Sequence, residues 1–90
     1  MYKIEYTKRF KKDVKRAVKR GYNMSLLENA IDLLQKTGTL PPEYKTHILH
    51  GDYAGKYECH IKSDWLMIWE QNDDILKLLF LATGTHSDLF

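Results

Sequence analysis

Two consecutive prolines, Pro41 and Pro42, divide this 90-residue sequence into a part with helical spacing and a part with strand-like alternation. A proline fixes its own φ and biases the preceding residue away from the helical region, so no helix continues across this point. Before the prolines, apolar residues recur at helical intervals within residues 8–20 and 25–37, after a short strand predicted at 2–5. After them, alternation predicts strands at 45–49, 56–61, 65–70 and 75–82, with turns at 51–52 and 72–74.

The ends of both predicted helices carry capping signals. Thr7 precedes the first helix as its N-cap, and Gly21 follows it as a residue suited to left-handed backbone. The second helix is predicted to begin with a capping box, Ser-Leu-Leu-Glu at 25–28, and to end at Gly38. The first helix is expected to present an apolar stripe to the core, made of Phe10, Val14, Ala17 and Val18.

The order of these segments indicates an α+β fold in one domain that spans residues 1–90. The short connection between the helices predicts an antiparallel hairpin. This hairpin is expected to cover one face of a mainly antiparallel sheet of four to five strands, with the apolar segment 75–81 as a central strand. No signal peptide or membrane span is recognisable, so we expect a cytoplasmic protein without a membrane partner.

Residues 57–65, Tyr-Glu-Cys-His-Ile-Lys-Ser-Asp-Trp, combine a predicted strand with three groups that can transfer or orient protons. Side chains alternate along a strand, which places Glu58 and His60 on one face and the single cysteine, Cys59, on the other. Because burial of an ionised carboxylate without partners is costly, we expect Glu58 and His60 to lie on an open face, opposite the helices. The turn at 62–64 is expected to bring Asp64 back beside His60. Cys59 is predicted to be buried and unreactive.

Three kinds of chemistry are compatible with these groups. Glu58 and His60 could bind a metal together with His86, although their spacing matches no recognised metal motif. Nucleophilic catalysis is disfavoured, because no serine or cysteine lies in a supportive context. General acid–base cleavage of RNA fits better, because the substrate supplies its own nucleophile, the 2′-hydroxyl, and histidine titrates near neutral pH. This chemistry requires neither a metal nor a cofactor.

The first predicted helix is strongly basic, although the whole chain has a formal net charge of only +2. Within residues 8–20 a single acid, Asp13, stands among the cations Lys8, Arg9, Lys11, Lys12, Lys15, Arg16, Lys19 and Arg20. A solvated outer face would explain a few such charges, but this density favours contact with the phosphate backbone of a nucleic acid. At the C-terminus, Phe90 is a core residue, a frayed end or an aromatic that stacks on a base.

Two motifs together resemble the YafQ-like toxins of the RelE/ParE superfamily: Glu-Cys-His-Ile-x-x-Asp-Trp at 58–65 and Gly-Thr-His-Ser-Asp-Leu-Phe at 84–90. The resemblance covers the whole chain and implies the RelE-like fold. It also implies the toxin of a prokaryotic type II toxin–antitoxin pair, a ribosome-dependent endoribonuclease that enters the A site and cuts translated mRNA without metal. The implied partner is a DinJ-like antitoxin that wraps the toxin, and the complex is expected to bind its own operator DNA.

The resemblance further implies a set of catalytic positions, which are His47, Glu58, His60, Asp64, His86 and Phe90. In this interpretation His60 and His86 exchange protons with the 2′-hydroxyl and the 5′-oxygen, while Asp64 and Glu58 orient or charge the imidazoles. His47 binds phosphate and Phe90 stacks on a base. The basic first helix then meets ribosomal RNA.

The chain departs from the family pattern at Tyr57 and Ala82, where relatives often carry arginine. Their absence removes charge that could stabilise the phosphorane. Lys56 shares the strand parity of Glu58 and is a candidate replacement that would contact RNA. Two other functions remain compatible with the sequence, namely a non-catalytic ParE-like toxin that inhibits gyrase and a nucleic-acid-binding domain. The first is not expected to carry this His/Asp/Glu set, and the second would tolerate its loss.

Overall fold

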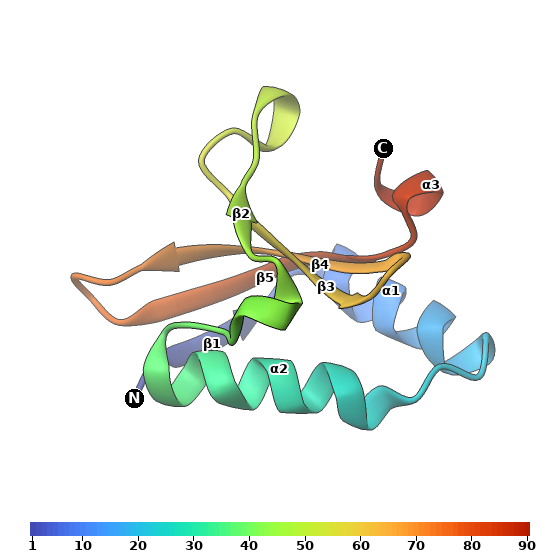
Figure 1. Ribbon diagram of the computed structural model, residues 1–90, viewed down its shortest axis with the longest axis horizontal. Helices are drawn as coiled ribbons and strands as arrows, with labels where there is room; N and C mark the ends of the chain where they lie inside the picture. Colours follow the sequence, from blue (N-terminus) through green and yellow to red (C-terminus); the bar gives the residue numbers. More distant parts are fainter.

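The computed structural model, which describes residues 1–90, is built on a five-stranded sheet with the strand order β1-β5-β4-β3-β2 (Figure 1). β1 runs parallel to β5, and every other neighbouring pair is antiparallel. The predicted α+β class and mainly antiparallel sheet are therefore confirmed. The strands are β1 (Lys3–Tyr6), β2 (His47–Ile48), β3 (Tyr57–Lys62), β4 (Trp65–Asn72) and β5 (Lys77–Gly84). The α-helices are α1 (Lys8–Lys19), α2 (Met24–Thr37) and α3 (His86–Leu89), and the 3₁₀-helices are η1 (Pro42–Tyr44) and η2 (Gly51–Tyr53).

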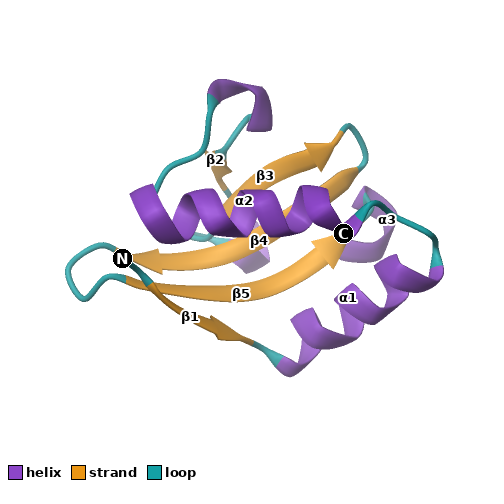
Figure 2. Ribbon diagram, turned by 90° about the horizontal axis from the view of Figure 1, so that it is seen from below, coloured by secondary structure: helices purple, strands orange, loops and turns teal.

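The two long helices cover one face of the sheet, as the sequence predicts. α2 lies below the sheet in Figure 1, and Figure 2, seen from below, shows α2 in front of the strands and α1 beside β5. Burial of apolar side chains between these layers is the main stabilising contribution to the fold. The buried residues of this core are Phe10, Ala17, Leu27, Ala30, Leu34, Cys59, Trp65, Met67, Trp69, Leu78 and Phe80.

The helix ends follow the capping signals with one exception. The Thr7 side chain accepts a hydrogen bond from the backbone N–H of Phe10 at 3.0 Å, which confirms it as the N-cap of α1. α2 begins earlier than predicted, because the Asn23 side chain accepts the backbone N–H of Ser25 and the predicted capping box does not form. Gly38 ends α2 with φ at +74°. None of the helices combines the length and the apolar character needed to cross a membrane.

Two of the predicted strands have different bounds in the structure. β2 is reduced to His47–Ile48, because only these two residues pair with β3. β5 begins at Lys77, since Leu76 adopts a left-handed backbone with φ at +51° in the exposed turn after β4. β5 pairs with β1 and β4, which confirms it as an interior strand.

The apolar stripe of α1 was predicted with one wrong member. Val18 is 57% exposed, while the side chain of Asp13 is buried. The reason lies at the end of β5, which continues for four residues beyond Phe80, the last of its residues that pairs with β1. There Asp13 accepts the backbone N–H of Thr83 at 3.1 Å, so an α1 side chain takes the place of a missing strand.

The second face of the sheet is not open, contrary to the sequence-based expectation. A second buried cluster, Leu66, Ile68, Ala82 and Leu89, lies on it, with Leu49, Tyr53 and Leu81 packed against its edge. Figure 1 shows η2 and α3 above this face, away from α1 and α2. η2 and α3 thus cover part of this face. Glu58 and His60 lie on the same face, opposite Ile68 and Leu66 of β4.

Candidate active site

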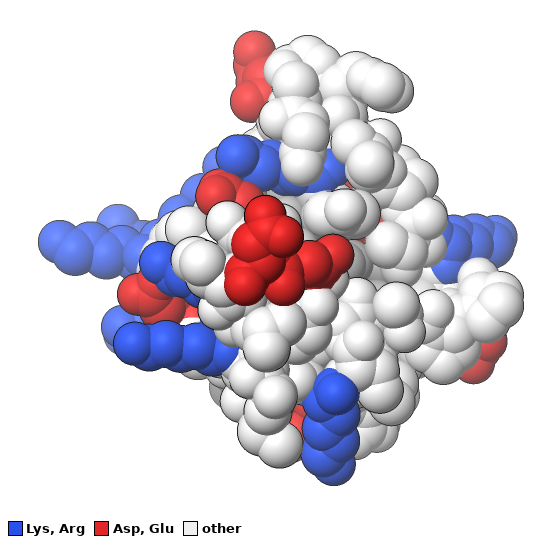
Figure 3. All heavy atoms as spheres, turned by 90° about the vertical axis from the view of Figure 1, so that its left-hand side faces the viewer, with Lys and Arg blue, Asp and Glu red and all other residues white.

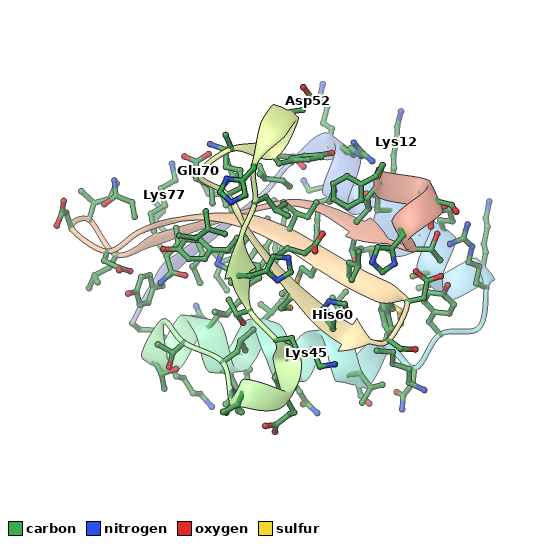
Figure 4. All side chains as sticks on the ribbon, turned by 45° about the horizontal axis from the view of Figure 1, so that its top comes forward. Lys12, Lys45, Asp52, His60, Glu70 and Lys77 are labelled. Carbon is green, nitrogen blue, oxygen red and sulfur yellow. The ribbon has the colours of Figure 1, made fainter.

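Three imidazole rings form a row on the second face of the sheet. The ring centroids of His47 and His60 are 6.2 Å apart, and those of His60 and His86 are 6.1 Å apart. The rings come from β2, β3 and α3, which meet here because β2 pairs with β3 and the chain turns back after β5. His60 lies opposite Leu66 on β4, so it shares the face of the second cluster. Figure 4 shows His60 near the C-terminal end of β3.

Asp64 lies beside His86, not beside His60 as predicted. One carboxylate oxygen, Oδ1, is 2.6 Å from His86 Nδ1 and also accepts the backbone N–H of His86 at 2.9 Å. The backbone N–H and then the ring of His86 lower the pKa of Asp64 below its ordinary value of 3.8. The β3–β4 turn is too tight to bring Asp64 back beside His60, so its carboxylate contacts His86 of α3 instead.

His60 and His86 are held through the same ring nitrogen. His60 Nδ1 lies 3.4 Å from the backbone oxygen of Ser63, and His86 Nδ1 is bound to Asp64. A carbonyl or carboxylate oxygen only accepts, so each Nδ1 carries the hydrogen. In both rings Nε2 is left free of protein partners. Two neighbouring histidines therefore present a nitrogen that can take up or release a proton.

His47 and Glu58 form a third contact in the row. His47 Nδ1 donates to the backbone oxygen of Lys45 at 2.9 Å, and His47 Nε2 lies 3.0 Å from Glu58 Oε1. Glu58 is only 4% exposed, which contradicts the expectation of an open carboxylate, and its Oε2 has no hydrogen-bond partner. His47 is therefore the only side chain that pairs with the buried carboxylate.

Phe90 is neither a core residue nor an isolated end. Its side chain is 66% exposed, and its ring meets the ring of Tyr53 edge to face, with centroids 5.8 Å apart. The Tyr53 hydroxyl accepts from Arg9 Nη1 at 3.0 Å. Phe90 therefore offers an exposed aromatic face at the margin of the histidine row, where a base could stack on it.

The predicted RNA-binding cations of α1 divide into two groups. None of the five lysines has an ion pair, and all five are exposed: Lys8, Lys11, Lys12, Lys15 and Lys19. In Figure 4, Lys12 projects from α1 far from His60. The three arginines instead contact acids, backbone or side-chain groups of the protein itself. The structure thus leaves the lysines, and not the arginines, free for a polyanion.

Other charged groups lie away from the histidine row. Lys56 does not reach it, because its Nζ lies 3.0 Å from Glu70 Oε2, and Figure 4 places Glu70 well along the sheet from His60. Figure 3 shows acidic side chains gathered at the centre of the end face that carries the β4–β5 turn, with basic ones around them. The exposed acids of that turn are Asp73 and Asp74.

The two positions that lack the family arginines differ in their relation to the row. The ring of Tyr57 stacks on Trp69 with centroids 5.7 Å apart, on the helical side of the sheet. An arginine at this position would therefore point away from the histidines, so its absence removes no charge from them. Ala82 is fully buried in the second cluster, on the same face as the row.

Metal and thiol chemistry find no support among the groups present. No set of three or more His, Cys, Asp or Glu side chains is arranged to hold a metal ion. Cys59 is fully buried, as predicted, and burial raises the pKa of its thiol to about 12. The cysteine therefore acts as a small apolar core residue.

A hollow of about 430 Å³ opens beside Asp64, between the α1–α2 turn and the β3–β4 turn. Its volume falls within the range of natural ligand sites. It is lined by Gly21, Tyr22, Asn23, Lys62, Ser63, Asp64 and Trp65. The sequence pattern did not predict this hollow, because its two walls are forty residues apart in the chain.

The sequence reasoning also missed the charged residues that surround α3. Asp88 pairs with Arg20 and Arg16, and Asp13 pairs with Arg16 and Arg9. Two signals for this network were present: a lone acid in a basic helix, and a capping-box pattern in which Thr85 is followed three residues later by Asp88. Neither signal indicates which long-range partner the acid has.

Comparisons with known proteins agree with this architecture. The family model described as "Bacterial toxin of type II toxin-antitoxin system, YafQ" matches residues 2–90. The mRNA interferase toxin YafQ of Escherichia coli strain K12 is 41% identical over 88 residues, which cover 97% of this chain and 94% of that protein. The crystal structure of the E. coli DinJ–YafQ complex contains a chain with a TM-score of 0.90 and 40% identity, covering 100% and 99% of the two chains. A metal-bound toxin from Helicobacter pylori also has a TM-score of 0.90, with 37% identity and full coverage of both chains. The chain therefore belongs to the YafQ family of bacterial toxins from type II toxin–antitoxin systems.

Proposed function

We propose that this toxin is an mRNA interferase, an endoribonuclease that cleaves translated mRNA on the ribosome. The observation that carries the proposal is the pair of adjacent histidines, His60 and His86, each held at Nδ1 with Nε2 free. Two proton carriers side by side are what cleavage of a phosphodiester next to a 2′-hydroxyl requires. The E. coli relative that shares 41% of its residues with this chain is named an mRNA interferase.

The proposed reaction needs only proton transfer from the protein. One histidine takes the proton of the 2′-hydroxyl as its oxygen forms a bond to phosphorus, and the other gives a proton to the 5′-oxygen as the P–O5′ bond breaks. The products are a 2′,3′-cyclic phosphate and a free 5′-hydroxyl. The centroids of the two rings are 6.1 Å apart, so both histidines can contact one phosphate. No metal ion and no cofactor take part in this proposal.

The remaining residues of the set take supporting roles. Asp64 fixes the ring orientation of His86. His47, held in place by the buried Glu58, binds the phosphate. Phe90 offers an exposed ring on which a base stacks. The hollow beside Asp64, with Lys62 at its wall, accommodates a neighbouring nucleotide.

Dependence on the ribosome is the second part of the proposal. The five free lysines of α1 form a basic surface separate from the histidine row, which suits contact with ribosomal RNA in the A site while mRNA lies in the active site. A toxin of this kind acts in the bacterial cytoplasm, where mRNA is translated. Residues 1–90 would act as one catalytic domain.

The proposed partner is a DinJ-like antitoxin. A chain of the same fold is found in the E. coli DinJ–YafQ complex. On the helical side of this toxin, an apolar groove of about 430 Å³ separates α1 from α2 and is flanked by Lys11 and Lys15. An amphipathic antitoxin segment with acidic flanks would fit this groove. Binding of the pair to operator DNA would then depend on the antitoxin.

The test is cleavage of an mRNA in a purified translation system, with and without ribosomes and with a chelator present. We expect cleavage only with ribosomes, unaffected by the chelator, and reduced about 10²- to 10⁴-fold by His86→Ala. His50→Ala is the matched control, because His50 is exposed, outside the row and without a hydrogen-bond partner. A substrate with 2′-deoxyribose at the cut site should resist. Cleavage that is indifferent to His86 would overturn the proposal and favour a non-catalytic toxin.

A further inference from the structure

α3 is a helix of four residues and cannot hold its position by its own hydrogen bonds. It nevertheless carries His86 and precedes Phe90. Its fixed points are Leu89, which is buried in the second cluster, and Asp88, which contacts α1. The contacts of Asp88 therefore determine the position of His86.

Asp88 is bound on both sides. Its carboxylate accepts two hydrogen bonds from Arg20, at 2.6 and 3.0 Å, in a bidentate pair, and Oδ2 lies 3.6 Å from Arg16 Nη2. The same carboxylate caps α3, because Oδ2 accepts the backbone N–H of Thr85 at 2.8 Å. Arg9 donates to the backbone oxygen of Asp88 at 3.3 Å. Arg9 and Arg16 of α1 and Arg20, its C-cap, thus converge on one residue of α3.

Arg16 and Asp13 also hold the end of β5, the strand that precedes α3. Arg16 Nη2 donates to the backbone oxygen of Thr83 at 3.1 Å, and Asp13 accepts the backbone N–H of the same residue. Gly84 follows, and a Cβ there would lie 2.7 Å from Asp88 Oδ2 and 2.8 Å from Arg16 Nη2. The close approach of these groups therefore requires glycine at position 84.

We propose that the arginines of α1 hold α3, through Asp88, where His86 meets Asp64, and that their role is to position this histidine and not to bind RNA. This inference rests on the proposed function of His86. It divides the basic helix into lysines that face the ribosome and arginines that face the active site. Arg16 and Arg20 are positioning residues in this account, because neither touches the reacting phosphate.

Arg20→Ala and Lys3→Ala form a matched pair that tests the proposal. Both substitutions remove one positive charge, and Lys3 is an exposed residue of β1 without an ion pair and outside the proposed RNA-binding surface. We expect Arg20→Ala to lower kcat about 10- to 100-fold, the size of effect that follows a displacement of about 1 Å in an active site. Lys3→Ala should leave kcat unchanged. Arg20→Lys, which keeps the charge but not the bidentate geometry, should fall between wild type and Arg20→Ala.

The second readout needs no RNA. The proton that His86 Nδ1 donates to Asp64 gives a low-field NMR resonance, which we expect in the wild type and in Lys3→Ala, and weakened or lost in Arg20→Ala. Thermal unfolding of each variant confirms that it is folded. If Arg20→Ala keeps this resonance and raises only KM, the positioning role is wrong. If His86→Ala cleaves normally, the proposed function is wrong, while the resonance still shows whether the arginines hold His86.

Discussion

Asp64 Oδ1 binds two groups of His86, the backbone N–H and the ring Nδ1, and so fixes both the position and the rotation of this ring. The two residues are 22 positions apart, and β4 and β5 lie between them in the sequence. The contact joins the β3–β4 turn to α3. This contact therefore forms the border of the active site where His60 and His86 lie side by side.

Asp64→Asn is expected to lower kcat about 10²-fold, because a single amide oxygen without charge holds the backbone N–H and the ring Nδ1 of His86 more weakly than the carboxylate does. Single-turnover cleavage of ribosome-bound mRNA measures the effect. Asp74→Asn, at an exposed position in the β4–β5 turn, is the control and should retain the wild-type rate. Equal rates for wild type and Asp64→Asn would remove the carboxylate from the mechanism.

The stability of the toxin should fall at acidic pH, and Asp88 should account for part of the loss. The pKa of Asp88 is held below its ordinary value of 3.8 by Arg20 first and by the backbone N–H of Thr85 next. Such a carboxyl binds protons more readily in the unfolded chain, so its contribution is complete above about pH 5 and is lost as pH falls through 3.8 and below.

Urea unfolding at pH 7 and pH 3 tests this expectation. Asp88→Asn should lower the free energy of unfolding at pH 7 by about 1–3 kcal/mol, because a charged, hydrogen-bonded partner is removed. It should also shrink the difference between the two pH values. Asp52→Asn, an exposed residue of η2 without a partner, should leave that difference as in the wild type. An unchanged difference in Asp88→Asn would assign the acid loss to other carboxyls.

Gly84→Ala should lower the free energy of unfolding by about 1–3 kcal/mol, because the added methyl group meets Asp88 and Arg16 at under 3 Å. Gly21→Ala provides a contrast, since that position has φ at +78° and open space around it. Its cost of about 1 kcal/mol would come from the backbone alone. Only Gly84→Ala should also lower the cleavage rate. A Gly84→Ala variant with wild-type stability and activity would show that the close packing there is dispensable.

Val14→Asp should weaken binding of the antitoxin without lowering cleavage. Val14 lines the apolar groove between α1 and α2, on the opposite side of the sheet from the histidine row. A carboxylate there would oppose an acidic, amphipathic segment. Titration calorimetry with the purified antitoxin measures the affinity, with Val18→Asp as the control, since Val18 is exposed on the same helix but does not line the groove. Equal affinities for both variants would exclude the groove as the binding surface.

The parts of the fold that depend on local sequence were predictable. Alternation located β3 and β4, helical spacing located α1 and α2, and Thr7 and Gly38 marked helix ends. These features arise from residues within a few positions of one another, where the period of apolar side chains decides the structure. The motifs at 58–65 and 84–90 also indicated the family, and through it the residues of the histidine row.

The errors concern contacts between distant segments. Glu58 was expected in the open, but it is buried and pairs with His47 of β2. Asp64 was expected to lie beside His60, which is close to it in the sequence, but its partner is His86 of α3. Asp13 was recognised only as the single acid of a basic segment, because its contact with the end of β5 depends on the lengths of the strands. The contacts of such side chains depend on the topology of the fold, which local sequence propensities do not determine.

The measurement that tests the mechanism most directly replaces the 5′-oxygen at the cut site with sulfur, a leaving group that needs no proton. If one of the two histidines is the general acid, its alanine variant should cleave the sulfur substrate at nearly the wild-type rate while remaining slow on the oxygen substrate. The alanine variant of the other histidine should be slow on both. We predict this split between His60→Ala and His86→Ala, which also identifies the acid. Equal loss of activity on both substrates for both variants would contradict proton transfer by this pair.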